Sequence, residues 1–576
     1  MSERRPGVHV VTTRREYKDR VYESHLLRRS YREGSSVKKE TLANLTPLGS
    51  ELVEVIRSGL RGQRVGVIEE LLPPVRSLPH GHVQAVVRAM ERLGMERLLA
   101  SRPSRERAII LALIACRVLD PMSKLATTRS WGSTTAASAF GVEDARVDEV
   151  FAAMDWLALA RERIEAKLAA RHLREGGLAL FDLSGSYVEG AHHELAAFGH
   201  PRDGKRGKKQ VNWGVIGDAE GRPIGLRVFR GNTADPTALR SAVRALRERF
   251  GLSSFVLVGD RGMITSRHIQ EFREDDPAIA WITALRAKSI QKLMLQGVIQ
   301  TSLFEQTNIA EVASPDYPGE RLIACRNPVL ARERAHHRRA LLDAASAKLE
   351  KLRASVQQGR LRKEHAIALR VGAALAQHKM RKHFMLTIAE GTLEYQIDRD
   401  TVAREAASDG IYVIRSNVPN EQKDANALVH AYKDLAHLER AFKSLKHVDL
   451  QVRPIRHRKA DRTTAHLFIC LLAYYVRWHM ERAWAPLTFK DQHPTPDHLK
   501  DPVAPATRSA AAQRKASTRT TDDGSPTHSF TTLLKSLSTI VRNTHQHPTT
   551  GITIELATIP TTHQQRALDL IDTINP

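Results

Sequence analysis

Cysteine is scarce in this sequence, and long apolar segments are missing. The 576 residues include three cysteines, widely spaced and never in a C-x-x-C pair: Cys116, Cys325 and Cys470. This spacing argues against a zinc site and favours buried thiols in a reducing compartment. The N-terminus has no apolar segment of signal-peptide length, and the longest apolar run, residues 108–116, is too short to span a bilayer. We therefore expect a soluble cytosolic protein with no membrane partner.

Acidic residues are far outnumbered by basic ones. The chain has 88 Lys and Arg against 64 Asp and Glu, a net charge of +24 and a pI near 10.1. Polyanion binding is the leading explanation, and nucleic acid is the commonest polyanion. Ribosomal and membrane-surface proteins can be as basic, so charge alone leaves these classes open.

Two short apolar runs each carry an aspartate. Residues 178–185, LALFDLSG, contain Asp182, and residues 255–260, FVLVGD, end in Asp260 before turning through Arg261 and Gly262 toward a helix. A carboxylate in a buried strand is costly unless a cation balances it, and a metal ion is the natural candidate. Two strand-borne carboxylates then need a third ligand.

Residues 431–448 have helical periodicity and supply the third candidate, Glu439. At 3.6 residues per turn, the face that carries Glu439 also carries five other side chains: Tyr432, Leu435, Phe442, Lys443 and Lys446. One helix face thus combines a carboxylate, two lysines, a tyrosine and apolar packing residues.

This helix resembles the Y-x2-R-x3-E-x6-K helix of bacterial insertion-sequence transposases. Tyr432, Glu439 and Lys446 match that pattern, whereas the Arg position of the family is Leu435 here. Further blocks are similar to the subgroup with long transposases and occur in its order: SHLLRRSYREGSSVKKETLANL, HPRDGKRGKKQVNWGVIGD, FRGNTADPTAL, VLVGDRGMIT and RTTAHLFICLLAY. The resemblance covers residues 22–480.

The resemblance implies a DDE transposase with an RNase H-like catalytic domain. Two Mg²⁺ ions, for which Mn²⁺ can substitute, would be held by Asp182, Asp260 and Glu439, with Asp182 bridging both; hard oxygen ligands suit Mg²⁺. Tyr432, Lys443 and Lys446 would hold DNA phosphates. The implied partner is double-stranded DNA, both the terminal inverted repeats and the target, bound by at least a homodimer in the bacterial cytoplasm at the nucleoid.

Basic clusters flank the expected metal site. Lys205, Arg206, Lys208 and Lys209 occupy a Gly- and Lys-rich hairpin tip after Asp182. Arg456 and Arg458 belong to a second cluster that also contains Arg453 and Lys459. We expect these residues and Arg261 to contact DNA, although such charge runs also occur as solvated turns. Asp235, followed by Pro236, is expected to be a helix N-cap.

The expected fold is an α/β RNase H-like catalytic domain, a mixed sheet with flanking helices, together with a mixed insertion subdomain and a mainly helical N-terminal region. Glu439 lies 179 positions after Asp260, too far for a loop, which predicts the insertion. A Pro-, Thr- and Ser-rich composition after about residue 484 predicts a tail. The expected regions are a basic β-hairpin region at 1–50, a helical DNA-binding or scaffold region at 51–175, the first part of the catalytic core at 176–286, the insertion at 287–408, the second part of the core at 409–484, and a flexible basic tail at 485–576.

The leading hypothesis is a transposase that binds terminal inverted repeats and carries out metal-dependent cleavage and strand transfer, as in cut-and-paste transposition. An RNase H-like nuclease or resolvase would share the three carboxylates, and a catalytically inactive transposase-derived DNA-binding protein is a third class. Metal-dependent nicking separates the enzymes from the binding protein. Joining of 3′ ends separates a transposase from a nuclease.

Overall fold

The computed structural model describes residues 7–17, 20–63, 72–276, 278–496, 501–504, 507–548 and 550–576. The chain divides into two compact units, Met1–Leu78 with Val541–Thr558 and Pro79–Ile540 with Ile559–Pro576. None of the helices in the described part combines the length and apolarity that crossing a membrane requires.

The first unit contains two small antiparallel sheets. One has the order β1-β2-β3, with β1 at Gly7–Tyr17, β2 at Arg20–Glu33 and β3 at Ser36–Asn44, and is followed by α1 at Ser50–Leu60. The predicted hairpin is β2–β3, which turns at Gly34 with a φ of +63° that favours glycine; β1 is an additional strand. The other sheet has the order β16-β15-β4, with β4 at Pro74–Pro79, β15 at Val541–Gln546 and β16 at Thr553–Ala557.

The second unit begins with a helical region that shares one core with the sheet after it. Its helices are α3 (Gly81–Arg92), α4 (Met95–Leu99), α5 (Arg105–Leu119), α6 (Lys124–Arg129), α7 (Ala136–Ala139) and α8 (Val147–His172), with a 3-10 turn at Trp131–Ser133. The apolar run of α5 is buried on all sides, as is α17 (Ala460–Ala483), which packs against α5, α8 and β7. These helices are therefore a structural part of the second unit's main core.

The central sheet has eight strands in the order β10-β11-β14-β9-β8-β5-β6-β7. Strands β5, β8 and β9 are parallel, and the other neighbouring pairs are antiparallel. The strands are β5 (Leu178–Tyr187), β6 (Gln210–Gly217), β7 (Pro223–Arg230), β8 (Phe255–Val258), β9 (Ile279–Ala284), β10 (Ile309–Val312), β11 (Arg321–Arg326) and β14 (Ile411–Ser416). The helical segments between them are α9 (Asp235–Arg244), a π-helical turn at Ala245–Arg249, α10 (Ser266–Asp275), α11 (Ala287–Leu295) and a 3-10 turn at Thr301–Phe304.

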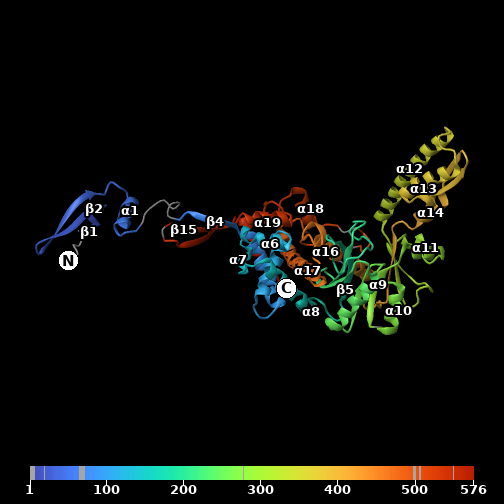
Figure 1. Cartoon of the computed structure of the whole chain (residues 1–576), viewed down its shortest axis with the longest axis horizontal. Helices are drawn as coiled ribbons and strands as arrows, with labels where there is room; N and C mark the ends of the chain where they lie inside the picture. The colour runs from blue at the N-terminus through green and yellow to red at the C-terminus, as the bar shows by residue number, and fades with distance from the viewer. Residues whose placement is uncertain are drawn as a thin grey trace. The chain divides into compact units, whose positions relative to one another are not determined.

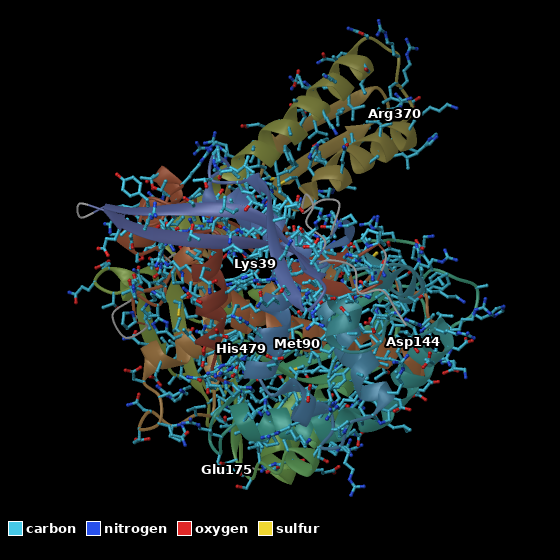
Figure 2. The ribbon with its side chains drawn as sticks, turned by 90° about the vertical axis from the view of Figure 1, so that its left-hand side faces the viewer. Lys39, Met90, Asp144, Glu175, Arg370 and His479 are labelled. Carbon is cyan, nitrogen blue, oxygen red and sulfur yellow. The ribbon has the colours of Figure 1, made fainter. Side chains whose placement is uncertain are left out.

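An inserted subdomain lies between β11 and β14 and has its own hydrophobic core, which includes Leu349, Ile367 and Leu375. Its elements are α12 (Pro328–Gln357), α13 (Glu364–His378), a 3-10 turn at Arg381–His383, β12 (Phe384–Ala389), β13 (Thr392–Ile397) and α14 (Arg399–Ala407). Figure 1 shows α12 and α13 side by side, and Figure 2 shows Arg370 among the side chains on their outer surface. Residues 321–326 fall within the expected insertion at 287–408 but form β11 of the central sheet instead, because their backbone pairs with β10 and β14.

The expected helix over 431–448 is not continuous. The chain forms α15 (Ala425–Lys433) and α16 (Leu435–Lys443), and a π-helical turn at Ser444–Val448 follows. Between the two helices His437 N donates to Asp434 O at 2.8 Å, a tighter i to i+3 turn. A regular α-helix with 3.6 residues per turn therefore does not run through the whole segment.

The C-terminal residues form helices, in contrast to the flexible tail that their composition predicts. A 3-10 turn at Ala485–Leu487 precedes α18 (Ala510–Thr518), α19 (Phe530–Ser538) and α20 (Thr562–Asp572). Leu533 and Leu537 of α19 and Leu568 of α20 are buried in the main core. The Ser and Thr content of this region suggests a tail, but several of these residues are helix N-caps. The side chains of Ser509, Ser529 and Thr561 accept backbone N–H groups at the starts of α18, α19 and α20.

Candidate functional site

The pairing of β5 with β8 brings Asp182 level with Asp260. In this parallel pair Leu178 lies opposite Val256 and Leu180 opposite Val258, an offset of 78 residues. The same offset separates Asp182 from Asp260, which follows two residues after β8 ends. Adjacent strands lie roughly 4.8 Å apart. The two aspartates thus stand at neighbouring positions where β8 leaves the sheet.

Negative charge accumulates around Asp182. Burial, together with the smaller effects of the Asp260 and Glu439 charges, raises the pKa of the Asp182 carboxyl to about 6. The Leu183 N–H, which donates to Asp182 Oδ1 at 2.7 Å, and the charge of Arg202 oppose that increase. The structure therefore brings all three predicted carboxylates within electrostatic reach of one another.

Helices α15 and α16 place Tyr432 and Glu439 next to the aspartates. Helix α16 packs against β5 and carries Glu439 on an exposed position, and the Tyr432 hydroxyl donates to Asp260 Oδ1 at 3.5 Å. Burial, and then the charge of Asp260, raises the pKa of Tyr432, whereas Arg261 lowers it. Tyr432 and Arg261 thus both lie close to Asp260.

The two lysines of this segment face different surroundings. Lys446 is half-buried, and its pKa is lowered to about 8 by burial and by Arg453, while Asp203 and Asp182 act in the opposite direction. Lys443 is exposed and lines a pocket with Glu481 and Arg482. The prediction of one shared face therefore does not hold for Lys443, which lines this other pocket, whereas Lys446 lies within electrostatic reach of Asp182.

The predicted basic loop between β5 and β6 is exposed and anchored at Asp203. The Asp203 carboxylate accepts Tyr187 N at 2.9 Å and Lys205 N at 3.0 Å, and it pairs with Arg453 at 3.4 Å. This anchor leaves four cationic side chains exposed: Lys205, Arg206, Lys208 and Lys209.

The second basic cluster meets this loop. Lys209 and Arg458 line one cavity of about 470 Å³. Arg456, in contrast, is exposed and pairs with Glu189 at 3.2 Å.

The ion pair between Arg202 and Asp235 is absent from the sequence prediction. Asp235 is not the N-cap of α9, because Ala234 occupies that position and the Asp235 carboxylate accepts Arg202 instead. A Cβ at Gly262 would lie 3.7 Å from Asp235 Oδ2, which places the pair beside the Asp260 turn. Arg202 lies in the quoted basic block, but 33 positions separate it from Asp235 and no local pattern links the two.

The chemistry of the three carboxylates fits a hard divalent cation. Their mutual repulsion, visible at Asp182, is what a cation would relieve. Within the described residues, however, no three His, Cys, Asp or Glu side chains converge closely enough to hold an ion. The donor set is thus of the right chemical kind for such a cation.

Comparison with known protein families identifies the family to which the central part of the chain belongs. A family model described as "Transposase DDE domain" matches residues 181–476, slightly more than half of the chain. The chain belongs to the DDE transposase family. A second model, "IS1634 family transposase, N-terminal domain", matches residues 10–66 of this DDE transposase.

Among solved structures, one titled "Cryo-EM structure of piggyBac transposase synaptic complex with hairpin DNA (SNHP)" is similar to this transposase. The match covers 69% of this chain and 72% of that chain, with a TM-score of 0.33 and 8% sequence identity. No curated protein sequence matches.

Proposed function

We propose that this DDE transposase binds the terminal inverted repeats of its element and catalyses metal-dependent DNA cleavage and strand transfer. The observation that carries the proposal is the electrostatic coupling of Asp182 to Asp260 and Glu439, from two strands and a helix. The strand order β7-β6-β5-β8-β9, with β5, β8 and β9 parallel, supports an RNase H-like core. The protein would work as a homodimer on DNA in the cytoplasm, at the nucleoid.

In this proposal Asp182, Asp260 and Glu439 hold Mg²⁺ ions, which supply Lewis-acid stabilisation of the phosphodiester oxygens. The residues around them act on the DNA. Lys446 and Arg261 hold backbone phosphates next to the carboxylates, and the Tyr432 hydroxyl orients Asp260. Lys443, Arg456, Arg458 and the basic loop bind phosphates farther from the reacting bond.

The test is cleavage of supercoiled plasmid that carries the flanking inverted repeats, with Mg²⁺, Mn²⁺ or EDTA. The intact protein is expected to cut at the repeat boundary and to join the 3′ ends to target DNA when Mg²⁺ or Mn²⁺ is present, and to do neither in EDTA. Glu439→Gln is expected to lose both steps, whereas Glu248→Gln, the same change at an exposed position in the π-helical turn after α9, is expected to retain them. Cutting without joining would favour the nuclease class, and binding without cutting under any condition would favour the inactive binding protein.

The basic loop is expected to contribute electrostatically to DNA binding. A variant carries Ala at Lys205, Arg206, Lys208 and Lys209. The slope of log K against log salt concentration for repeat DNA is expected to be smaller by about 2–4 in magnitude, because each phosphate contact contributes roughly 0.9 to that slope. The measurement is affinity as a function of salt concentration. The matched control removes four exposed cations elsewhere, Arg244, Arg508, Arg514 and Lys535. An equal reduction in both variants would mean that net charge, not this loop, carries the effect.

A further inference from the structure

A cationic pocket of about 360 Å³ lies between the helical region and the loop that precedes α17. Its charged and titratable lining residues come from α5, α6, that loop and α17: Arg117, Lys124, Arg453, Arg456, His457 and His466. None of the described residues that line it is an Asp or a Glu.

Two of these cations are buried without a carboxylate partner. Arg117 is 6% exposed and Lys124 is 5% exposed. Arg117 donates to the Met122 carbonyl at 2.8 Å, and Lys124 Nζ lies 2.8 Å from His466 Nδ1. Within the described chain, no Asp or Glu lies at ion-pair distance from either side chain. Burying unpaired charge is unfavourable, so the site is electrostatically incomplete.

The hydrogen bonds of His466 fix its role. Its Nε2 lies 3.0 Å from the Val452 carbonyl and must therefore carry a proton to donate. Nδ1 of the neutral ring is then the acceptor for Lys124. A neutral imidazole nitrogen is the single side-chain acceptor for this ammonium group in the described structure, which leaves the positive charge uncompensated.

A second buried lysine shows how this fold accommodates such a charge elsewhere. Lys515 is 3% exposed, and its Nζ donates to three carbonyl oxygens, those of Ala485, Thr488 and Lys490, at 2.7, 2.9 and 3.1 Å. Lys515 is therefore satisfied by the protein itself. Lys124, in contrast, lines an open pocket with one imidazole partner.

The charges that act on the pocket are mostly cationic. The pKa of Lys124 is lowered to about 7 by burial and then by Arg117, and the pKa of His457 is lowered to about 3 by burial and then by Lys124. An anion bound in the pocket would offset the repulsion between these positively charged groups and would favour their protonated forms.

We propose that this pocket binds one phosphate group of the DNA backbone through Arg117, Lys124 and Arg456. The assignment of the phosphate to DNA rests on the proposed function. The inference that the pocket binds a phosphate group rests on the pocket's own residues and is independent of that function. Arg453 connects the pocket to the candidate site, because it lines the pocket, pairs with Asp203 and acts electrostatically on Lys446. The bound phosphate would thus add one contact to the DNA strand on the side of the candidate site that Arg453 joins to the pocket.

The first experiment measures thermal unfolding of the full-length, DNA-free protein in sodium phosphate and in sodium chloride at equal ionic strength. Phosphate is expected to raise the midpoint, because a ligand of the folded state stabilises it. Lys124→Met is expected to weaken phosphate binding about tenfold or more, since a charge-assisted hydrogen bond is lost. Its midpoint in chloride is expected to equal or exceed that of the intact protein, because the unpaired charge is gone.

Control variants keep this experiment interpretable. Lys515→Met is expected to lower the midpoint in both salts but to retain the phosphate-specific increase, and the exposed Lys535→Met is expected to behave like the intact protein. Arg456→Gln, at an exposed position of the pocket, is expected to reduce the increase without unfolding the protein. The proposal would be overturned if phosphate did not raise the unfolding midpoint of the intact protein more than chloride does. It would also be overturned if Lys124→Met showed the same increase in midpoint as the intact protein.

The second experiment identifies the source of the phosphate. Repeat duplexes with a neutral methylphosphonate at one backbone position are tested in turn for binding to the intact protein and to Lys124→Met. One position is expected to weaken binding of the intact protein and to have no effect on the variant. If saturating DNA leaves the phosphate-specific increase unchanged, the ligand is a free phosphate compound and the DNA assignment is overturned. Neither readout requires cleavage, so failure of the proposed transposition reaction would be seen separately.

Discussion

Asp182→Asn is expected to lower the rate of metal-dependent cleavage by about 10³-fold or more, because several kcal/mol of metal-derived stabilisation is lost and each 1.4 kcal/mol is tenfold. The same substitution is expected to raise the midpoint of thermal unfolding without divalent ions. Burial and the neighbouring charges of Asp260 and Glu439 disfavour the ionised carboxyl, and an amide removes that repulsion. The measurements are plasmid cleavage and unfolding of the metal-free protein.

Glu175→Gln is the matched control for both readouts. Glu175, labelled in Figure 2, precedes β5, and its carboxylate accepts the backbone N–H groups of Ser253 and Ser254 at 2.8 Å just before β8. These hydrogen bonds lower the pKa of Glu175 to about 2, so the ionised form favours folding. We expect Glu175→Gln to lower the midpoint and retain cleavage. An Asp182→Asn protein that lost cleavage together with stability would instead indicate a structural role for Asp182.

Glu165→Met is expected to lower the free energy of unfolding by about 3–5 kcal/mol, because it leaves a buried arginine without its counterion. Glu165 is fully buried in α8 and accepts Arg227 Nη1 at 2.8 Å, Arg161 Nη1 at 3.0 Å and Leu226 N at 2.9 Å. These bonds join the helical region to β7. The measurement is equilibrium denaturation.

Two further variants separate charge from packing. Glu162→Met, on the same helix but about half exposed, is expected to cost less than about 1 kcal/mol although it also pairs with Arg161. Arg227→Met combined with Glu165→Met is expected to recover much of the lost stability, since no unpaired charge remains. If the double variant were as unstable as the sum of the single ones, lost packing would be the cause.

The sequence predicts the central strands and the candidate carboxylates because each depends on local patterns. Residues 178–185 and 255–259 are apolar runs of strand length, and an aspartate in or after such a run is conspicuous. Leu342 and Leu349 of α12 lie seven residues apart, about two helical turns, and both are buried in the core of the inserted subdomain.

The remaining differences depend on information that local patterns do not contain. The break at Asp434 and the π-helical turn after Lys443 interrupt the predicted helix, and no distinct composition marks either position. The pairing of Arg202 with Asp235 links residues far apart in the chain. The helices after residue 484 are stabilised by burial against a core that the rest of the chain supplies, which composition alone cannot indicate.

The inserted subdomain enters and leaves the sheet at a single place. Arg326, the last residue of β11, is paired with Ile411, the first of β14, and Asn327 N donates to Gly410 O at 2.9 Å. About 80 residues lie between these two strand ends, yet the segment begins and ends at hydrogen-bonded neighbours. A tight hairpin turn could therefore join β11 to β14 in place of the whole subdomain. A module attached in this way is free to diverge, lengthen or be exchanged between lineages while the sheet beneath it keeps its register.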